Sequence, residues 1–130
     1  MNLRRNRWLL ALLSLCLLLC AAPRSSAQDV YATIHGTVTD ASGAVVSHAA
    51  VTVINTSTGI STKATADDKG YYIFPQLQVG GPYTVTVTAP NFQNSITSGL
   101  TLNVNDNREV NAKLSVGKAT QTVEVSATAV

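Results

Sequence analysis

Apolar and polar side chains alternate one by one along most of the sequence after residue 30. The stretches 33–39 (TIHGTVT), 49–55 (AAVTVIN) and 83–89 (YTVTVTA) show this pattern most clearly. Alternation with a period of two places the apolar side chains on one face of a β-strand, whereas a helix needs a period of 3.6. The pattern therefore favours a sheet with one buried face and one exposed face.

Turn residues divide this region into seven predicted strands. The turns include residues 40–43 (DASG) and 67–70 (DDKG), where aspartate bonds to nearby backbone and glycine accepts a positive φ. Short strands separated by such turns predict an all-β fold, a seven-stranded antiparallel β-sandwich. The other four predicted strands cover residues 62–66, 71–77, 99–104 and 109–116. The predicted core consists of Ile34, Val38, Val51, Val53, Tyr72, Phe74, Leu77, Tyr83, Val85 and Val87.

A basic and then strongly apolar segment precedes the strands. Three arginines lie between residues 4 and 7, an apolar run covers residues 8–22, and small residues lead up to Ala27. This layout predicts a helical signal peptide over residues 1–27, cleaved after Ala27. The apolar run is shorter than the roughly 20 residues that cross a bilayer, which argues against a membrane anchor. We expect export by general secretion to the periplasm, the outer membrane or the extracellular space.

Cleavage would change both the charge and the cysteine content of the chain. The whole chain carries +2, but residues 28–130 keep five basic and seven acidic residues, a net charge of −2. A surface with so few cations does not hold a nucleic acid backbone, so no nucleic acid partner is expected. Cys16 and Cys20 are both removed with the signal peptide, and the remaining chain can form neither a disulfide nor a thiolate metal site.

Several motifs occur in an order typical of one domain family. Residues 36–43 read Gly-x-Val-x-Asp-x-x-Gly, residues 50–53 read Ala-Val-x-Val, residues 70–77 read Gly-x-Tyr-x-Phe-x-x-Leu, residues 83–87 read Tyr-x-Val-x-Val, and Phe92 follows. This series resembles the carboxypeptidase regulatory-like domain, which is a transthyretin-like (prealbumin-like) sandwich related in fold to starch-binding modules. The resemblance implies one such domain over residues 28–117.

Two loop positions depart from the family pattern. Ser47-His48 stand where family members often have Pro-Gly, and Asn91 stands where they often have glycine before the phenylalanine. Asparagine tolerates the left-handed conformation better than most residues do. These departures concern loop geometry and leave the expected fold intact.

The tail, residues 118–130, extends the resemblance. An exported N-terminal copy of this domain is similar to the opening of Oar-like TonB-dependent outer-membrane receptors, and residues 120–127 (TQTVEVSA) resemble a TonB box. The resemblance implies that the C-terminal domain of TonB is a partner, bound by β-augmentation. Contact with the outer membrane would require a barrel that is missing from this sequence. The alternative is that the tail forms an eighth strand of the sandwich. The TonB-box-like residues are Gln121, Thr122, Val123, Glu124, Val125, Ser126 and Ala127.

We predict no catalytic residue, no cofactor and no metal site. An enzyme needs a nucleophile, a base and a stabilising group in one cleft. His35 and His48 are the only histidines, and no third ligand stands at a recognisable metal-binding spacing from them. The expected function is therefore that of a non-catalytic accessory or interaction domain.

Carbohydrate binding is the alternative function, because the resemblance extends to starch-binding modules. Sugars are usually held by exposed aromatic side chains. The family pattern assigns four aromatic residues after Ala27 to the core, namely Tyr72, Phe74, Tyr83 and Phe92. Tyr31 and Tyr71 remain as the sugar platform of this alternative.

Overall fold

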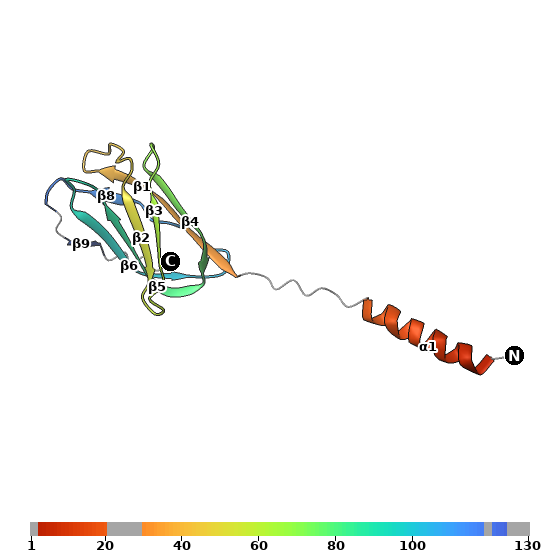
Figure 1. Ribbon diagram of the computed structural model, residues 1–130. Coiled ribbons are helices and arrows are strands. Elements are labelled where there is room, and N and C mark those ends of the chain that lie inside the picture. The colour runs from red at the N-terminus through yellow and green to blue at the C-terminus, as the bar shows by residue number, and fades with distance from the viewer. Residues whose placement is uncertain (1–2, 21–29, 119–120, 125–130) are drawn as a thin grey trace.

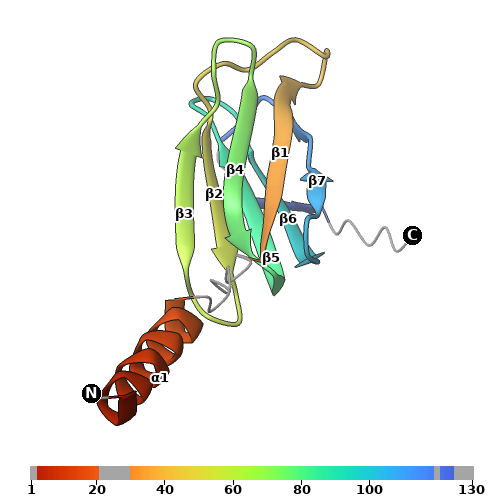
Figure 2. The same cartoon turned by 90° about the vertical axis from the view of Figure 1, so that its right-hand side faces the viewer.

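The computed structural model describes residues 3–20, 30–118 and 121–124, and within these ranges one helix precedes nine β-strands (Figure 1). The strands lie in two layers (Figure 2), which confirms the predicted all-β sandwich. The elements are α1 (Leu3–Cys20), β1 (Tyr31–Asp40), β2 (Ala50–Asn55), β3 (Ser61–Thr65), β4 (Tyr71–Gln78), β5 (Gly80–Thr88), β6 (Asn94–Leu102), β7 (Asn107–Glu109), β8 (Ala112–Leu114) and β9 (Gln121–Glu124).

The two sheets differ in how their strands pair. One sheet has the order β4-β1-β7, with β8 also pairing with β1, and the other has the order β3-β2-β5-β6-β9. The long strands pair in antiparallel fashion, as predicted. The three short strands run parallel to their neighbours, β7 and β8 to β1 and β9 to β6. The structure thus corrects the expected set of seven antiparallel strands at its C-terminal end, where residues 109–116 do not form one continuous strand.

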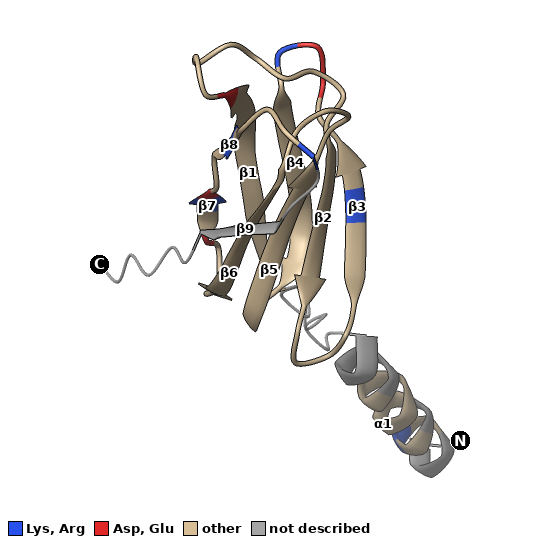
Figure 3. Cartoon of the chain, turned by 90° about the vertical axis from the view of Figure 1, so that its left-hand side faces the viewer, with Lys and Arg blue, Asp and Glu red and all other residues tan. Residues whose placement is uncertain are grey.

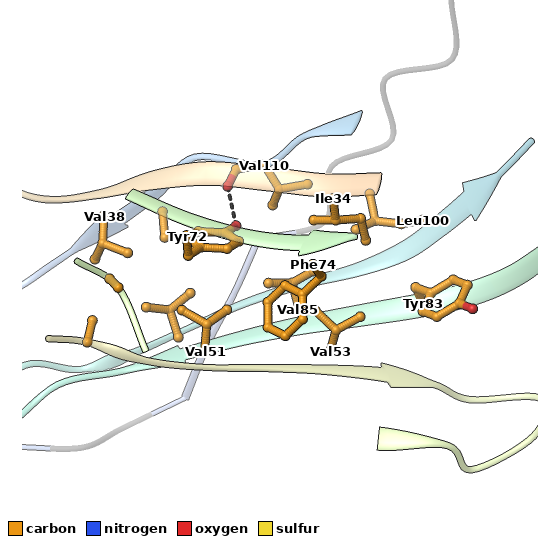
Figure 4. Close-up of a cluster of buried hydrophobic side chains, with 14 of the residues drawn as sticks. Ile34, Val38, Val51, Val53, Tyr72, Phe74, Tyr83, Val85, Leu100 and Val110 are labelled. Atoms are coloured by element: carbon orange, nitrogen blue, oxygen red, sulfur yellow. Dashed lines mark hydrogen bonds between the residues drawn. The ribbon is translucent and has the colours of Figure 1, made fainter. Parts of the chain in front are cut away.

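A break at Val110 separates β7 from β8. The Val110 side chain is buried in the core, and its backbone N–H donates a hydrogen bond of 2.7 Å to the carbonyl of His35. The Tyr72 hydroxyl donates to the Val110 carbonyl (Figure 4), and burial raises the pKa of this hydroxyl. Gly36 makes room for the same carbonyl, because a Cβ at this position would lie 1.9 Å from its oxygen. Packing between distant residues therefore interrupts the strand, and no turn sequence marks the break.

All ten predicted core residues are buried (Figure 4). Burying a valine or a larger apolar side chain stabilises a fold by about 1.5–3 kcal/mol, so these residues account for much of its hydrophobic stabilisation. Phe92, also expected in the core, is partly buried against it. The remaining buried apolar residues extend the same core to both ends of the sandwich, and they are Ala32, Val46, Ala49, Ala66, Leu100, Leu102, Val110, Ala112 and Leu114.

Strand β6 begins at Asn94, five residues before the predicted start at residue 99. Its first inward-facing residues are the buried Ser95 and Thr97, which pair with Val87 and Val85 of β5. Because these buried residues are polar, the alternation of apolar and polar side chains is lost where the strand begins. The sequence pattern consequently missed this half of β6.

Helix α1 covers the segment predicted as the core of the signal peptide, while the predicted cleavage site after Ala27 lies outside the described residues. The large apolar side chains that the structure describes in α1, among them Trp8 and Leu13, are exposed. Among the residues described, no helix has both the length and the apolar character needed to span a membrane. The role of residues 1–27 in export stays a prediction.

Candidate functional site

The tail extends the five-stranded sheet at β6. Strand β9 pairs in parallel with the first half of β6, with Asn94 opposite Gln121 and Thr97 opposite Glu124. Four of the seven TonB-box-like residues therefore lie in an extended strand, while residues 125–127 lie outside the described part of the chain. This placement agrees with the eighth-strand alternative for the tail, and it leaves binding of TonB a prediction.

Backbone hydrogen bonds fix the chain that leads into the tail. Gln93 N donates to the carbonyl of Ser115 at 2.8 Å, and Gly117 N donates to the carbonyl of Asn91 at 3.1 Å. Asn91 adopts a φ of 67°, the left-handed conformation that glycine often supplies at this position in the family. The chain is thus fixed next to the start of β6 as far as Gly117, the residue before the tail.

The two tyrosines of the predicted sugar platform lie far apart. Tyr31 begins β1 opposite Gln78 of β4, whereas Tyr71 begins β4 opposite Thr37 of β1. Thr37 lies six positions after Tyr31 along β1, a span of about 20 Å. Both tyrosines are exposed, but the structure does not bring them into one site.

Tyr71 lies beside His35, and His48 lies beside Asp68. The Tyr71 ring lies 6.1 Å from the ring of His35 on the outer face of β1 and β4. His48 lies in the loop before β2, where its Nε2 is 3.2 Å from a carboxylate oxygen of the exposed Asp68. Within residues 3–20, 30–118 and 121–124, no three His, Cys, Asp or Glu residues come together as a metal site would require.

Tyr31 instead lines a cleft of about 270 Å³ at one end of the sandwich, which we call the end cleft. Its apolar residues include the buried Val53, Leu77 and Tyr83. Its lining comes from β1, from β2, β3 and the loop between them, from β4 and from β5. The complete lining is Tyr31, Val53, Asn55, Thr58, Ile60, Thr62, Gln76, Leu77, Gln78 and Tyr83.

Hydrogen bonds hold the loop between β2 and β3 that forms one wall of the end cleft. The side-chain oxygen of Asn55 accepts bonds from the backbone N–H groups of Ser57 and Thr58, at 3.0 and 3.3 Å. The Ser57 hydroxyl donates to the carbonyl of Gly81 at 2.7 Å, which ties the loop to the start of β5. Asn55 itself is only 5% exposed, so this amide supports the wall from inside.

A β-bulge in β4 forms another part of the wall. Ile34 pairs with Phe74 and Ala32 pairs with Leu77, so β4 carries one residue more than β1 between these pairs. Within this bulge Gln76 has a φ of 59°, in the left-handed region. Both bulge residues, Pro75 and Gln76, are exposed in a strand that otherwise alternates. β4 lies at the edge of its sheet, a position at which a proline within a strand is tolerated.

Among the described residues that line the end cleft, none is charged and none is a histidine. Figure 3 shows that the loop joining β2 to β3 carries no charge, whereas charged residues occur in the hairpin between β3 and β4. Sequence reasoning found Tyr31 but missed the rest of the end cleft, because the other lining residues come from segments far apart in the chain. Pro75 was the one local signal, since it marks the irregular part of β4.

These observations define a two-layer β-sandwich whose candidate sites are a strand edge and an uncharged cleft. A family model described as the carboxypeptidase regulatory-like domain matches residues 33–115. The chain therefore belongs to the carboxypeptidase regulatory-like domain family, as its motifs predicted. No curated protein matches the sequence.

Solved structures with similar folds share little sequence with this chain. They include catechol 1,2-dioxygenase from Acinetobacter radioresistens (14% identity, TM-score 0.58, 78% of this chain). The Bacillus anthracis TIE protein is also similar, with 19% identity and a TM-score of 0.56 over 67% of this chain. A candidate carbohydrate-binding protein from Bacteroides uniformis ATCC 8492 has 19% identity and a TM-score of 0.53 over 65% of this chain. The chain spans 57%, 17% and 41% of these three structures, respectively. Such likeness shows a shared fold.

Proposed function

We propose that this chain is an exported, non-catalytic accessory domain from the N-terminus of a TonB-dependent outer-membrane receptor. Residues 121–127 form the segment that the C-terminal domain of TonB binds. The observation that carries the proposal is the extended conformation of Gln121–Glu124 on a sheet edge. The signal-peptide pattern before the sandwich and the family assignment support the same domain order.

β-Augmentation suits such a tail. An added strand is held mainly by main-chain hydrogen bonds, so the segment must be extended and must have a sheet edge available. β9 is the last strand in the order β3-β2-β5-β6-β9, and in the described residues no strand pairs with its other edge. Its pairing with β6 is short and parallel, a geometry slightly less stable per residue than antiparallel pairing. The tail can therefore add to a second sheet or exchange one edge for another.

A pull-down with the C-terminal domain of TonB tests this proposal. Val123→Pro removes a main-chain donor from the tail and should abolish capture, because proline cannot donate to a ladder. Val123→Thr is the matched control, since it keeps both the donor and the preference for a strand. Capture of the proline variant at the level of the unaltered chain would contradict binding by β-augmentation. N-terminal sequencing of the exported product checks the leader, and its first residue should be Gln28.

A second candidate function is carbohydrate binding. The end cleft favours it, because its described residues combine the exposed Tyr31 with amide and hydroxyl side chains and include no charged one. The similar fold of the Bacteroides uniformis protein adds support at the level of architecture only. Binding of the exported chain to neutral glycans on an array would support this function, and an array without a signal would remove it.

A further inference from the structure

The end cleft is built for a neutral ligand. Its lining offers amides at Gln76 and Gln78, hydroxyls at Thr58 and Thr62, and the ring and hydroxyl of Tyr31. Amide and hydroxyl groups both donate and accept hydrogen bonds, as the hydroxyls of a sugar do. An anionic or cationic ligand would find no opposite charge among the described residues of this lining.

Gln76 is an unusual residue for the backbone conformation it adopts. The other non-glycine residues with positive φ in the described chain are His48, Asn91 and Asn105, and asparagine and histidine are types that enter the left-handed region comparatively often. Glutamine is not such a type, and glycine is the usual left-handed residue of a bulge. Strained residues of this kind cluster at ligand-binding sites, where the surrounding structure holds them in place. The strain at Gln76 therefore points to a use for its side chain in the end cleft.

We propose that the end cleft binds one neutral sugar unit, with the Tyr31 ring against the C–H face of the sugar and the Gln76 and Gln78 amides on its hydroxyls. This inference rests on the second candidate function and names its site. The cleft volume of about 270 Å³ is just below the usual range for small-molecule sites of about 300–1,000 Å³. A monosaccharide or the terminal unit of a longer glycan fits that size better than an extended oligosaccharide does.

The bulge and the bonded loop make the end cleft pre-formed. The loop after β2 is held by bonds to Asn55 and to the carbonyl of Gly81, and the Tyr83 hydroxyl donates to the carbonyl of Gln78 at 2.8 Å. A pre-formed site avoids much of the cost of ordering side chains and loops on binding. The sugar would then meet walls that already have their bound geometry.

Calorimetry on the exported chain tests the proposal, after an array of neutral glycans has selected among glucose-, galactose- and mannose-terminated probes. Tyr31→Ala should weaken binding at least about tenfold, the effect of losing roughly 1.4 kcal/mol of contact. Tyr71→Ala is the matched control, because this tyrosine is equally exposed but lies at the opposite end of the β1–β4 pair. Its affinity should equal that of the unaltered chain.

Gln76→Gly separates a ligand contact from a structural role. Glycine accepts the left-handed conformation without steric cost, so the melting temperature should stay the same or rise while binding is lost. Asn91→Gly relieves the same backbone conformation in the turn between β5 and β6, away from the end cleft, and it should leave binding unchanged.

Three results would overturn the proposal. Undiminished binding by both Tyr31→Ala and Gln76→Gly would place the sugar elsewhere and leave carbohydrate binding standing. No binding of any neutral glycan would remove both the site and the second candidate function. Tighter binding of an anionic probe such as glucuronate would contradict a neutral ligand. None of these results bears on the TonB pull-down, which tests a different segment.

Discussion

The two sheets of the sandwich are specified in different ways. In the sheet β3-β2-β5-β6-β9, the four long strands pair in antiparallel fashion, and hairpin connections join β2 to β3 and β5 to β6. In the other sheet, β1 is central and carries two short parallel strands on one side. Antiparallel neighbours can be set by a local turn, whereas parallel neighbours depend on contacts between distant parts of the chain. Sequence alternation therefore describes the long antiparallel strands of both sheets better than the short parallel strands β7, β8 and β9.

Three contacts at Val110 help to place the short strands β7 and β8 beside β1. Its amide bonds to His35, its carbonyl accepts the Tyr72 hydroxyl, and its carbonyl oxygen occupies the space left by Gly36. The apolar core is common to both sheets, since Val51 and Val85 come from the first and Phe74 from the second. Substitutions in the shared core should consequently cost stability in proportion to the apolar volume removed, whereas the second sheet should also respond to changes of a few atoms around Val110.

Tyr83→Ala tests the first sheet and should have the largest effect. Tyr83 is buried in β5, and removing a buried aromatic side chain costs about 3–5 kcal/mol. Chemical denaturation of the exported chain measures the loss. Tyr83→Phe is the control, because it removes only the bond to the Gln78 carbonyl and keeps the buried ring. An unchanged melting temperature for Tyr83→Ala would contradict its place in the core.

Gly36→Ala tests the second sheet with the smallest possible addition of atoms. The new methyl group would lie 1.9 Å from the Val110 carbonyl oxygen, so the backbone must move. We expect a loss of stability at the upper end of the about 1–3 kcal/mol that overpacking costs. Gly99→Ala in β6 is the control, because its Cβ meets nothing within 4 Å and only the left-handed φ of 75° opposes it. Placing an alanine in this left-handed conformation costs about 1–2 kcal/mol of stability. Equal losses for the two variants would remove the contrast between the sheets.

The sequence alone predicted the sandwich fold, the family and the core residues. Ile34, Val51 and Val85 were identified because each lies in a strand with one apolar face, and all are buried. The parts of the fold that the sequence pattern did not predict depend on buried polar groups or on distant contacts. Ser95 and Thr97 are buried polar residues and hide the start of β6, while the break at Val110 depends on Gly36 and Tyr72 far along the chain.

The candidate sites were predictable to different degrees. The tail was visible as a contiguous motif, but its parallel pairing with Asn94–Thr97 could not be read from that motif. The end cleft was represented by Tyr31 alone. Its other residues, such as Thr58 and Gln76, come together only when the ends of β1, β2 and β4 meet. Pairing Tyr31 with Tyr71 failed because both are exposed tyrosines and nothing in their sequence context gives their separation of about 20 Å.

Tyr72→Phe isolates one contact of the second sheet. The substitution keeps the buried ring but removes the hydroxyl that bonds to the Val110 carbonyl. An unsatisfied buried acceptor costs about 1–3 kcal/mol, and we expect a loss within this range in chemical denaturation. Tyr71→Phe on the exposed face is the control, and it should stay within about 0.5 kcal/mol of the unaltered chain. A Tyr72→Phe variant as stable as its control would mean that the hydroxyl does not fix the position of Val110.

The smallest effect is expected at the turn where the chain leaves β1 and crosses to the other sheet. The Asp40 carboxylate accepts bonds from the Ser42 hydroxyl at 2.6 Å and from the backbone N–H groups of Ser42 and Ala44. The Ser42 hydroxyl, assisted by these amides, holds the pKa of Asp40 below its ordinary value of 3.8. A carboxylate with a lowered pKa in the folded state stabilises the fold above the ordinary pKa, and this contribution is lost as the pH falls through the folded-state value.

Asp40→Asn keeps a side-chain oxygen that can accept these bonds but removes the titration. We expect the variant to melt slightly below the unaltered chain at about pH 6, and the difference to shrink as the pH falls through the lowered pKa of Asp40. The effect should be small because the carboxylate is fully exposed and solvent screens its charge. A difference in melting temperature that stays constant across this range would show that the turn depends on the shape of the side chain and not on its charge. The crossover between the sheets would then be fixed by backbone bonds, such as the one from Asp40 N to the Ala44 carbonyl at 2.8 Å.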